Sequence, residues 1–404
     1  MITSYSSFSS GGLLDKGYEA AGITPIFAVE MDPARCEMYK LNVGPHILCS
    51  KVEDATISQM LDMTGGVMPD VYHASPSCRQ ASQANSNKGE TQGDIDSAVA
   101  IAMNIKSIKP KVFTLENVRG YRHFVSFKLI VKTLKLLGYK VQYRVVCAAD
   151  YGVPQTRYRL MLVATRADMP SFDWPEPTHH DGPYQETQTL FGLEVVSPWV
   201  GWYEAIEDLI PTLEPDQFAQ WQLDRLPEAI QTLLISSENA GQEWGKRYQT
   251  PNEPTFTITP GMSPRAFIVD CQNGGFNGDG TRGLTVRQAS EPTYTLTGSM
   301  DRRPARALLI NARSTSYEAT CLEMPEPSHT VLATSIHGTV GTPKAWLEQG
   351  RVVRMSVKAL ARFQSVPDSY QFSGNNKLDC GIVGDGVPCK LAEAFGRQIV
   401  KLFE

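Results

Sequence analysis

The feature that most constrains the fold is an alternation, across residues 1–172, of short apolar runs with amphipathic stretches of helical length. This alternation is typical of βαβ units, in which helices connect the strands of one sheet. We expect strands over residues 26–30, 71–74, 112–116, 141–148 and 159–165. We expect helices over residues 33–42, 94–108 and 127–137. The pattern predicts a Rossmann-like, doubly wound parallel α/β sheet that binds ligands at the carboxyl ends of its strands.

The amino-acid composition and the pattern of apolar runs change after residue 172. Residues 173–188 are rich in Pro, His and polar side chains, as domain crossings are, and one helix is expected from Trp202. Farther on, short β-like runs are broken by Gly and Pro, and segments beginning at residues 251, 289 and 324 resemble one another around a Glu-Pro step. Related hairpin units would explain this likeness, and coincidence is the alternative. We expect a first domain over 1–172, a smaller β-rich domain over 173–345, and a C-terminal segment over 346–404 that returns to the first domain.

The C-terminal segment regains helical periodicity. A terminal helix from about Pro388 would carry one apolar face, made of Leu391, Phe395, Ile399 and Leu402. Burial of such a face is favourable, so this helix is expected to dock against the first domain.

Charge and cysteine content narrow the function classes. The net charge of −5 over 404 residues would repel nucleic acid, so a nucleic-acid site requires a local basic patch. The eight cysteines form no Cys-x-x-Cys pair, which argues against a zinc site or a dense disulfide framework. The start of the chain lacks a signal-peptide pattern, and no apolar run reaches about 18 residues. We expect a cytoplasmic protein without a metal or a membrane span.

A Gly-rich turn near the start of the chain is a candidate ligand loop. Residues 8–17 read FSSGGLLDKG, and Glu30 ends the next strand. Such a turn lets the backbone approach a ligand, and an acidic residue one strand later can bind ribose hydroxyls. A tight turn without a ligand and a nicotinamide site are the alternatives, although G-x-G-x-x-G is absent.

Chemically capable side chains follow two other predicted strands. Cys78 lies in a loop after one strand, beside Arg79, a cation that would stabilise a thiolate nucleophile. A buried structural cysteine is the commoner alternative. Glu116 and Asn117 end another strand, where a carboxylate is either a buried hydrogen-bonding group or a catalytic acid.

Two arginines lead into the last of these strands. Gln155, Arg157 and Arg159 alternate along the sequence, which places the arginines on one strand face. Such a pair suits recognition of an anion or a base, and a solvated edge strand is the alternative.

Seven segments, in order, resemble the motifs of the cytosine-C5 DNA methyltransferases. They are FSSGGLLDKGYEAAG, AVEMD, SPSC, LENV, YGVPQTRYR, MSVKALARFQSVPDSY and VGDGVPCKLAEAFG. The resemblance covers nearly the whole chain, since PEPTH and YEAIEDL after Asp173 look like family boundary segments. It implies an S-adenosylmethionine-dependent methyltransferase sheet, with a target-recognition domain over residues 173–345.

The resemblance also implies a mechanism. A cytosine would leave the duplex, Cys78 would add to its C6, and C5 would take the methyl group of S-adenosylmethionine. Glu116 would bind N3 and the exocyclic amine, Arg159 would bind the carbonyl O2, and Arg157 and Gln155 would support their loop. The implied partner is double-stranded DNA, bound by a monomer in the cytoplasm of a bacterium and encoded by the cell or by a phage.

The same resemblance implies a cofactor pocket in which Glu30 binds the ribose. Its expected lining is Phe8, Ser10, Gly11, Gly12, Leu13, Glu30, Met31, Pro76, Asn117, Asp385 and Val387.

Several positions depart from the family pattern. Ser10 stands in the place of the usual first glycine, Ser77 in the place of the second proline of Pro-Pro-Cys, and Arg79 in the place of glutamine. The usual Asp-x-Arg reads Asp-Ile-Asp at 94–96, and the late Gly-Asn reads Gly-Asp at 384–385. Since the candidate catalytic residues are all present, these departures indicate a divergent member.

The adenine site departs furthest from the family pattern. No Gly-Asp follows residues 49–51, and Glu53 or Asp54 is the candidate substitute. A non-catalytic DNA-binding homologue with a decayed cofactor site is therefore one alternative. The tRNA-methylating branch of the superfamily is a second, disfavoured because it lacks so large an insert. A nicotinamide dehydrogenase is a third, in which Cys78 and Glu116 would have no purpose.

Arginines supply the basic patch that DNA binding requires. Seven of them lie between residues 265 and 313, where they could bridge phosphates or read guanine. The family's short threonine motif matches both Thr295-Leu296 and Thr330-Val331, and the later pair is preferred. The candidate DNA contacts are Arg79, Ser82, Arg287, Thr295, Arg302, Arg303, Arg306 and Thr330.

Overall fold

The computed structural model describes residues 1–77, 89–181, 185–189, 192–214, 265–276, 282–288, 292–293, 306–314, 319–321 and 351–404. The described residues of Met1–Trp199 and Ala361–Glu404 form one compact unit. Those of Val200–Tyr294 and Met300–Leu360 form a second. The predicted boundaries after residues 172 and 345 stay a prediction.

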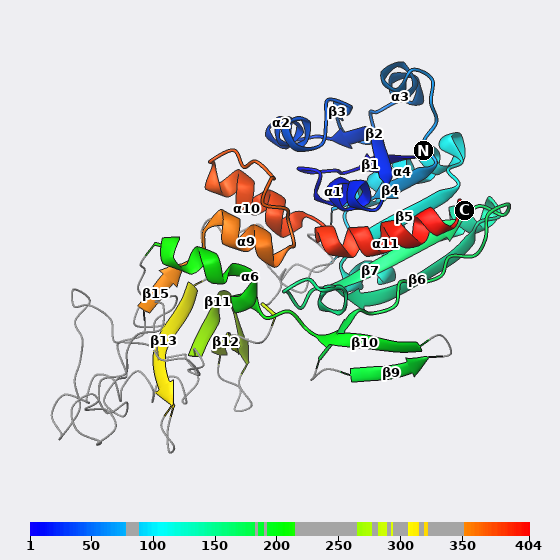
Figure 1. Ribbon diagram of the computed structural model, residues 1–404. Coiled ribbons are helices and arrows are strands. Elements are labelled where there is room, and N and C mark those ends of the chain that lie inside the picture. Colours follow the sequence, from blue (N-terminus) through cyan, green and yellow to red (C-terminus); the bar gives the residue numbers. More distant parts are fainter. Residues whose placement is uncertain are drawn as a thin grey trace, which may run out of the picture. The chain divides into compact units, whose positions relative to one another are not determined.

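A seven-stranded sheet forms the centre of the first unit, with the order β3-β2-β1-β4-β5-β7-β6 (Figure 1). Its strands are β1 (Ile2–Ser7), β2 (Ile23–Glu30), β3 (Ile47–Cys49), β4 (Val71–Ala74), β5 (Val112–Asn117), β6 (Lys140–Cys147) and β7 (Tyr158–Thr165). Its helices are α1 (Leu13–Ala20), α2 (Pro33–Asn42), α3 (Ile57–Thr64), α4 (Gln92–Ile108), α5 (Val125–Leu136), α10 (Asn376–Asp385) and α11 (Cys389–Lys401). The predicted Rossmann-like α/β class is confirmed, and α2 and β4 have the predicted bounds.

The direction of β7 differs from the prediction of an all-parallel sheet. Strands β1 to β5 run parallel to their neighbours, whereas β7 runs antiparallel to both β5 and β6. The reason is the connection from β6 to β7, which contains a short 3-10 turn at Ala148–Tyr151 and no crossover helix. As a result, the start of β7 lies beside the carboxyl end of β5.

Strand β1 was not among the predicted strands because its sequence, ITSYSS, is polar. Ser4, Ser6 and Ser7 are nevertheless almost fully buried. The Ser6 hydroxyl donates to Asp15 over 2.7 Å, and the Ser7 hydroxyl lies 2.8 Å from the Tyr72 hydroxyl. Such hydrogen bonds offset the cost of burying hydroxyls, so a central strand forms without an apolar run.

Apolar side chains cover both faces of this sheet. Neighbouring residues on one strand belong to different clusters: Val112 packs with α1 and α11, and Phe113 packs with α4 and α5. The predicted face of the terminal helix is confirmed, because Leu391, Phe395 and Ile399 are buried against the sheet. The C-terminal segment therefore completes one layer of the first unit.

A five-stranded antiparallel sheet forms the described core of the second unit, with the order β12-β11-β13-β14 and with β15 pairing β13. The strands are β11 (Arg265–Phe276), β12 (Arg282–Gln288), β13 (Arg306–Ser314), β14 (Ala319–Cys321) and β15 (Arg351–Arg354). The apolar segments 266–270 and 307–311 lie in the paired strands β11 and β13. The Glu-Pro segments themselves lie almost wholly outside the described residues.

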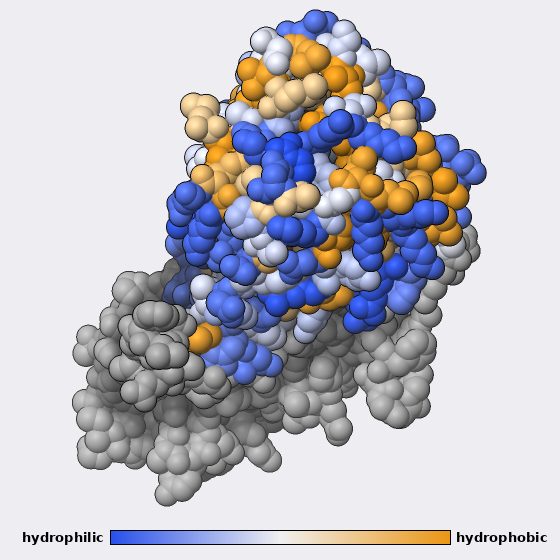
Figure 2. Space-filling model, turned by 90° about the vertical axis from the view of Figure 1, so that its right-hand side faces the viewer, coloured by the Kyte–Doolittle hydropathy of each residue, from blue (hydrophilic) through white to orange (hydrophobic). Residues whose placement is uncertain are grey.

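Shorter elements complete the described chain. They are β8 (His179–His180), β9 (Gln185–Thr189), β10 (Gly192–Pro198), α6 (Trp202–Ile206) and α9 (Val357–Phe363). The helix expected from Trp202 is confirmed as α6, followed by a 3-10 helix over Glu207–Thr212. In the part of the chain that the structure describes, no helix combines the length and apolar character of a membrane span. Apolar and polar side chains are interspersed on the face seen in Figure 2.

The docking of α11 can be tested at Phe395. Its ring lies 5.6 Å from the ring of Trp174 and 6.0 Å from that of Phe172. Phe395→Ala should therefore destabilise the protein by about 3–5 kcal/mol, measured by urea unfolding. Arg397→Ala, which removes an exposed ion pair on the same helix, is the control and should cost less than about 1 kcal/mol. Equal losses in the two variants would contradict this packing.

Candidate active site

The Gly-rich turn after β1 has an unusual backbone. Phe8, Ser10 and Gly12 have φ angles of 60°, 50° and 84°, in a region that side chains other than glycine rarely adopt. Such conformations persist where the surrounding structure imposes them, and they concentrate at ligand sites. The turn lies at the carboxyl end of β1 and leads into α1, so its position agrees with the predicted ligand loop.

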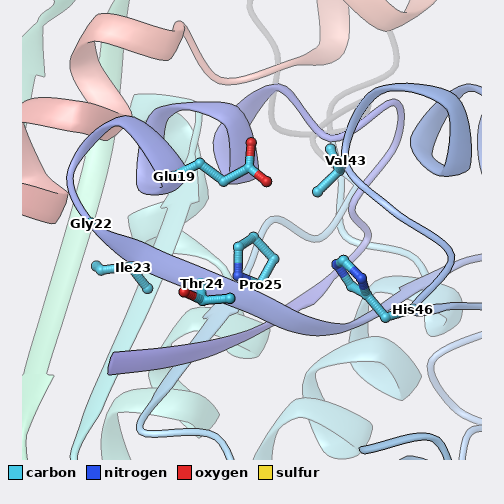
Figure 3. A pocket seen from close by; sticks show the side chains of 7 residues that line it. All are labelled: Glu19, Gly22, Ile23, Thr24, Pro25, Val43 and His46. Carbon is cyan, nitrogen blue, oxygen red and sulfur yellow. The ribbon is translucent and has the colours of Figure 1, made fainter. Parts of the chain in front are cut away.

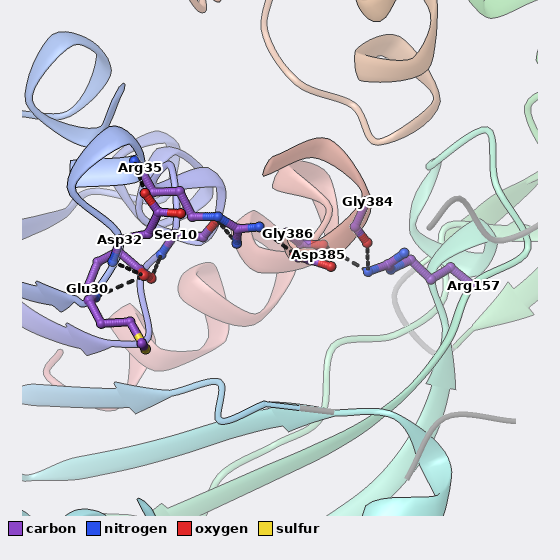
Figure 4. Close-up of polar contacts among 9 residues, drawn as sticks. Ser10, Glu30, Asp32, Arg35, Arg157, Gly384, Asp385 and Gly386 are labelled. Carbon is purple, nitrogen blue, oxygen red and sulfur yellow. Dashed lines mark hydrogen bonds and ion pairs between the residues drawn. The ribbon is translucent and has the colours of Figure 1, made fainter. Parts of the chain in front are cut away.

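Glu30 ties this turn to the end of β2. Its side chain is 8% exposed, and one carboxylate oxygen accepts the backbone amide of Ser10 over 2.9 Å. The other oxygen accepts the amides of Met31 and Asp32, each over 2.9 Å (Figure 4). Three backbone donors therefore hold one carboxylate, which fixes its position at the sheet edge.

Arg35 connects two positions that depart from the family pattern. Its guanidinium donates to the Ser10 hydroxyl over 2.9 Å and to the Asp385 carboxylate over 2.7 Å (Figure 4). A glycine at position 10 would offer no hydroxyl, and an asparagine at 385 would carry no charge. The two substitutions thus form one polar network, which bridges the ligand loop, α2 and α10.

The ligand loop also lies tightly against the C-terminal segment. The Tyr370 hydroxyl donates to the Gly11 carbonyl over 2.8 Å. A Cβ atom on Gly11 would come within 2.5 Å of the Tyr370 hydroxyl and 2.6 Å of Ile382. Glycine is therefore required here by close approach.

Glu116 and Arg159 form a buried ion pair at the carboxyl end of β5. The Arg159 Nε atom lies 2.7 Å from one Glu116 carboxylate oxygen, and both side chains are less than 10% exposed. The antiparallel register pairs Glu116 with Met161 and Asn117 with Leu160 across the two strands. Sequence reasoning selected both residues but did not anticipate their direct contact, which depends on the direction of β7.

The segment before Cys78 lies beside this ion pair. The Ser75 hydroxyl donates to the second Glu116 oxygen over 3.2 Å, and Asn117 donates to the Pro76 carbonyl over 2.9 Å. Cys78, Arg79 and Ser82 lie outside the described residues. Ser75 was missed by the sequence analysis, because a serine in a loop carries no signal of its own.

Arg157 and Gln155 occupy places apart from the ion pair. Arg157 is 1% exposed and donates to the carbonyls of Gly384 and Gly386, each over 3.0 Å (Figure 4). Gln155 is fully buried, and its side-chain amide has no hydrogen-bond partner among the residues that the structure describes. Arg157 precedes β7 and contacts the C-terminal segment, whereas Arg159 contacts Glu116, so the two arginines have different partners.

The remaining predicted cofactor residues differ in exposure. Leu13 and Val387 are buried, whereas Met31 is 62% exposed. Of the proposed adenine-site substitutes, Glu53 accepts the Ser97 hydroxyl over 2.6 Å, and Asp54 is exposed.

Few of the predicted DNA contacts lie in the described residues. Arg287 lies in β12 and Arg306 begins β13. Thr295, Arg302, Arg303 and Thr330 lie outside the described residues. Among the described residues, no group of three or more His, Cys, Asp or Glu side chains could hold a metal ion.

A surface hollow lies at the opposite edge of the sheet. Figure 3 shows it between Glu19 of α1, the start of β2 at Ile23, and His46 before β3. Burial lowers the pKa of His46. Because ligands of such sheets bind at the carboxyl ends of strands, we do not assign this hollow to the active site.

Gly11→Ala tests the close approach of the ligand loop and the C-terminal segment. The added methyl group must displace both Tyr370 and Ile382, so we expect a loss of about 1–3 kcal/mol in the free energy of unfolding. Gly93→Ala in α4 is the matched control, because its new Cβ would meet only Thr91 Oγ1 at 3.8 Å. Thermal or urea unfolding measures both, and equal stability of the two variants would refute the constraint.

Asp15, in the first turn of α1, makes stability depend on pH. Burial raises the pKa of this carboxyl from 3.8 to about 7. Its contribution is therefore present below pH 3.8 and is lost as pH rises through about 7. Between pH 4 and 7 the free energy of unfolding should fall less in Asp15→Asn than in the native protein. The difference in slope approaches about 1.4 kcal/mol per pH unit. Urea unfolding across this range measures the effect, with exposed Asp62→Asn as control, and parallel profiles for Asp15→Asn and the native protein would disprove it.

Comparisons with known proteins identify the family of this chain. The family model described as C-5 cytosine-specific DNA methylase matches residues 2–401. The Type II methyltransferase M.XorII of Xanthomonas oryzae pv. oryzae is 33% identical, over 98% of this chain and 83% of the relative. The Type II methyltransferase M.MthTI of Methanothermobacter thermautotrophicus is 26% identical, over 99% of this chain and 97% of the relative.

Solved structures share the fold. A putative DNA modification methyltransferase from an E. coli prophage superposes with a TM-score of 0.54 at 14% identity, covering 100% of this chain and 99% of the other. The Dnmt2 methyltransferase of S. pombe superposes with a TM-score of 0.53 at 11% identity, covering 100% and 98%. The family match favours the DNA-methylating enzyme over the alternatives raised from sequence. Since that match spans nearly the whole length, the chain belongs to the family of C-5 cytosine-specific DNA methylases.

Proposed function

We propose that this enzyme methylates C5 of a cytosine in double-stranded DNA, with Cys78 as nucleophile and Glu116 and Arg159 as the groups that bind the base. The observation that carries the assignment is the buried Glu116–Arg159 pair, which is hydrogen-bonded to Ser75 in the segment leading to Cys78. A carboxylate and a guanidinium so placed suit the two polar edges of a pyrimidine.

The chemistry requires a nucleophile because C5 of cytosine is itself weakly nucleophilic. Addition of the Cys78 thiolate to C6 breaks the C5–C6 double bond and places electron density on C5. C5 then takes a methyl group, a base such as water removes the C5 proton, and the electron pair of that C–H bond expels the thiolate. The thiol is thereby regenerated.

Glu116 keeps acceptor capacity for the base. Each carboxylate oxygen has two lone pairs. One oxygen already faces Arg159 and the other faces Ser75, so one lone pair on each is left, one for a proton held at N3 and one for the exocyclic amine. Arg159 bears the complementary charge for the carbonyl O2 as negative charge develops in the ring.

S-adenosylmethionine supplies an electrophilic methyl group on a sulfonium when it is bound. The carboxyl ends of β1 and β2 fit such a molecule, since a left-handed turn at Phe8–Gly12 and a fixed carboxylate at Glu30 meet there. Arg35 and Asp385 would fix the turn against α10. Met31, Pro76, Asn117 and Val387 are the further residues proposed to hold it.

Access to the base requires extrusion of the nucleotide, which costs a few kcal/mol of unstacking. We assign DNA binding to Arg79 and Ser82 near the nucleophile. The β-rich region supplies the remaining proposed contacts, among them Arg287 of β12 and Arg306 of β13. Several relatives are named Type II methyltransferases, so a role in restriction-modification is part of the proposal. We expect a monomer in the cytoplasm of a bacterium or of a phage-infected cell.

Cys78→Ala tests the nucleophile. The variant should lose methyl transfer to DNA, because no thiolate can add to C6, and should keep DNA binding. DNA containing 5-fluorocytosine should form a stable covalent complex with the native enzyme, since C5 cannot release fluorine as a cation, and none with the variant. Cys147→Ala, at a buried thiol that ends β6, is the control and should retain activity.

Full turnover by Cys78→Ala would refute the assigned nucleophile. Bisulfite sequencing of DNA from cells that express the native enzyme would give its activity and its target sequence together. An absence of any methylated cytosine there would contradict the proposed function as a whole.

A further inference from the structure

A line of buried polar side chains runs from the interior of the sheet to Glu116. The Tyr18 hydroxyl lies 3.0 Å from Thr114 Oγ1, which lies 2.8 Å from Nδ1 of His73. The other ring nitrogen, Nε2, lies 2.8 Å from Ser75 Oγ, and Ser75 donates to Glu116 over 3.2 Å. Four consecutive hydrogen bonds thus connect α1, β5 and β4 to the proposed base-binding carboxylate.

The carboxylate sets the direction of this chain. An ionised Glu116 is acceptor-only, so the Ser75 hydroxyl donates to it, and the Ser75 oxygen then accepts from His73 Nε2–H. The neutral imidazole has one N–H, so its Nδ1 must accept the Thr114 hydroxyl proton. Thr114 in turn accepts from Tyr18. Every hydrogen in the line therefore points toward Glu116.

Burial keeps His73 in the neutral form that this direction requires. The side chain is 2% exposed, and burial lowers the pKa of the imidazole to about 3. Among the described residues, the hydrogen-bond partners of the ring are two hydroxyls and no carboxylate, and Tyr18 packs edge-on at 6.2 Å between ring centroids. Thr114 is also fully buried.

We propose that Ser75, His73 and Thr114 are positioning residues for the reaction, which act through Glu116. Arg159 holds one carboxylate oxygen and the hydroxyl line holds the other, so the plane of the carboxyl group is fixed from two sides. The remaining lone pairs of the Glu116 carboxylate then point toward the proposed position of the base. This inference rests on the proposed role of Glu116 as the group that binds the base.

The simplest alternative is a satisfied core histidine with no influence on the reaction. Both readings predict lower stability when the line is broken. Only positioning predicts a loss in the methyl-transfer step at a temperature where the variant is fully folded. The two are therefore separated by a rate measured on folded protein.

Single-turnover methylation of a DNA duplex by the full-length enzyme provides that rate. Ser75→Ala should lower it by about 10- to 100-fold, because a misplacement near 1 Å can cost that much. The dissociation constants for DNA and for S-adenosylhomocysteine should change less than about twofold, since the variant removes no proposed contact with either. Thr114→Val and Thr114→Ser form a matched pair: the first removes the hydroxyl at nearly constant volume and should slow the step, and the second should restore it.

A rate for Ser75→Ala within twofold of the native rate would overturn the proposal. So would equal rates for the two Thr114 variants, or losses that follow DNA or cofactor-product affinity alone. Failure of the underlying function is distinguishable, since it would show as an inactive native enzyme or a fully active Cys78→Ala.

The direction of the line has its own readout. Protein labelled with 15N-histidine should show one imidazole protonated at Nε2 and neutral between pH 5 and 8, and His73→Gln should remove that signal. In Thr114→Val the 15N chemical shift of Nδ1 of this imidazole should change, because the hydroxyl that donates to it is gone. Thr114→Ser should keep the native chemical shift. A His73 protonated at Nδ1, or charged at pH 6, would refute the assigned direction.

Discussion

The buried contact between Arg159 and Glu116 is the interaction on which the proposed site depends. Two charges removed from water are stabilised only when geometry is good and the remaining hydrogen-bonding positions are filled. Here the distance is 2.7 Å, and Ser75 occupies the second carboxylate oxygen. The antiparallel direction of β7 makes the contact, because it brings the first residues of that strand to the end of β5. A parallel strand would start at the other edge of the sheet.

A second polar network organises the cofactor side of the same edge. Glu30 binds three backbone amides, and Arg35 joins Ser10 to Asp385. The Arg35 ion pair is partly exposed, so its contribution to stability is small, about 0–1 kcal/mol. Its value lies in fixing a turn whose backbone is unfavourable in isolation. The departures at positions 10 and 385 are thus explained together, as the two ends of one contact.

Sequence patterns predicted much of the fold, but few of its contacts. Helical periodicity and apolar runs located α2 and β4, because the buried positions of these elements carry apolar residues at the spacing typical of a helix or a strand. Strand β1 was not predicted because it has no apolar run, and the buried hydroxyls of Ser6 and Ser7 form hydrogen bonds with residues of other elements, Asp15 and Tyr72. The direction of β7 was not predicted because it depends on the length and shape of the connection between β6 and β7. The line through His73 could not be predicted, because its members share a place only after β4 and β5 pair.

The C-terminal segment covers the ligand loop but is synthesised long after it. Gly11 and Tyr370 are separated by 359 positions, yet one hydrogen bond joins them, and Arg157 reaches the carbonyls of Gly384 and Gly386. A ribosome adds roughly 5–20 residues per second, so the nascent ligand loop waits tens of seconds for the polypeptide that covers it. A messenger RNA truncated before codon 370 would thus yield a protein that has all seven strands of the sheet but lacks the C-terminal residues that contact the ligand loop.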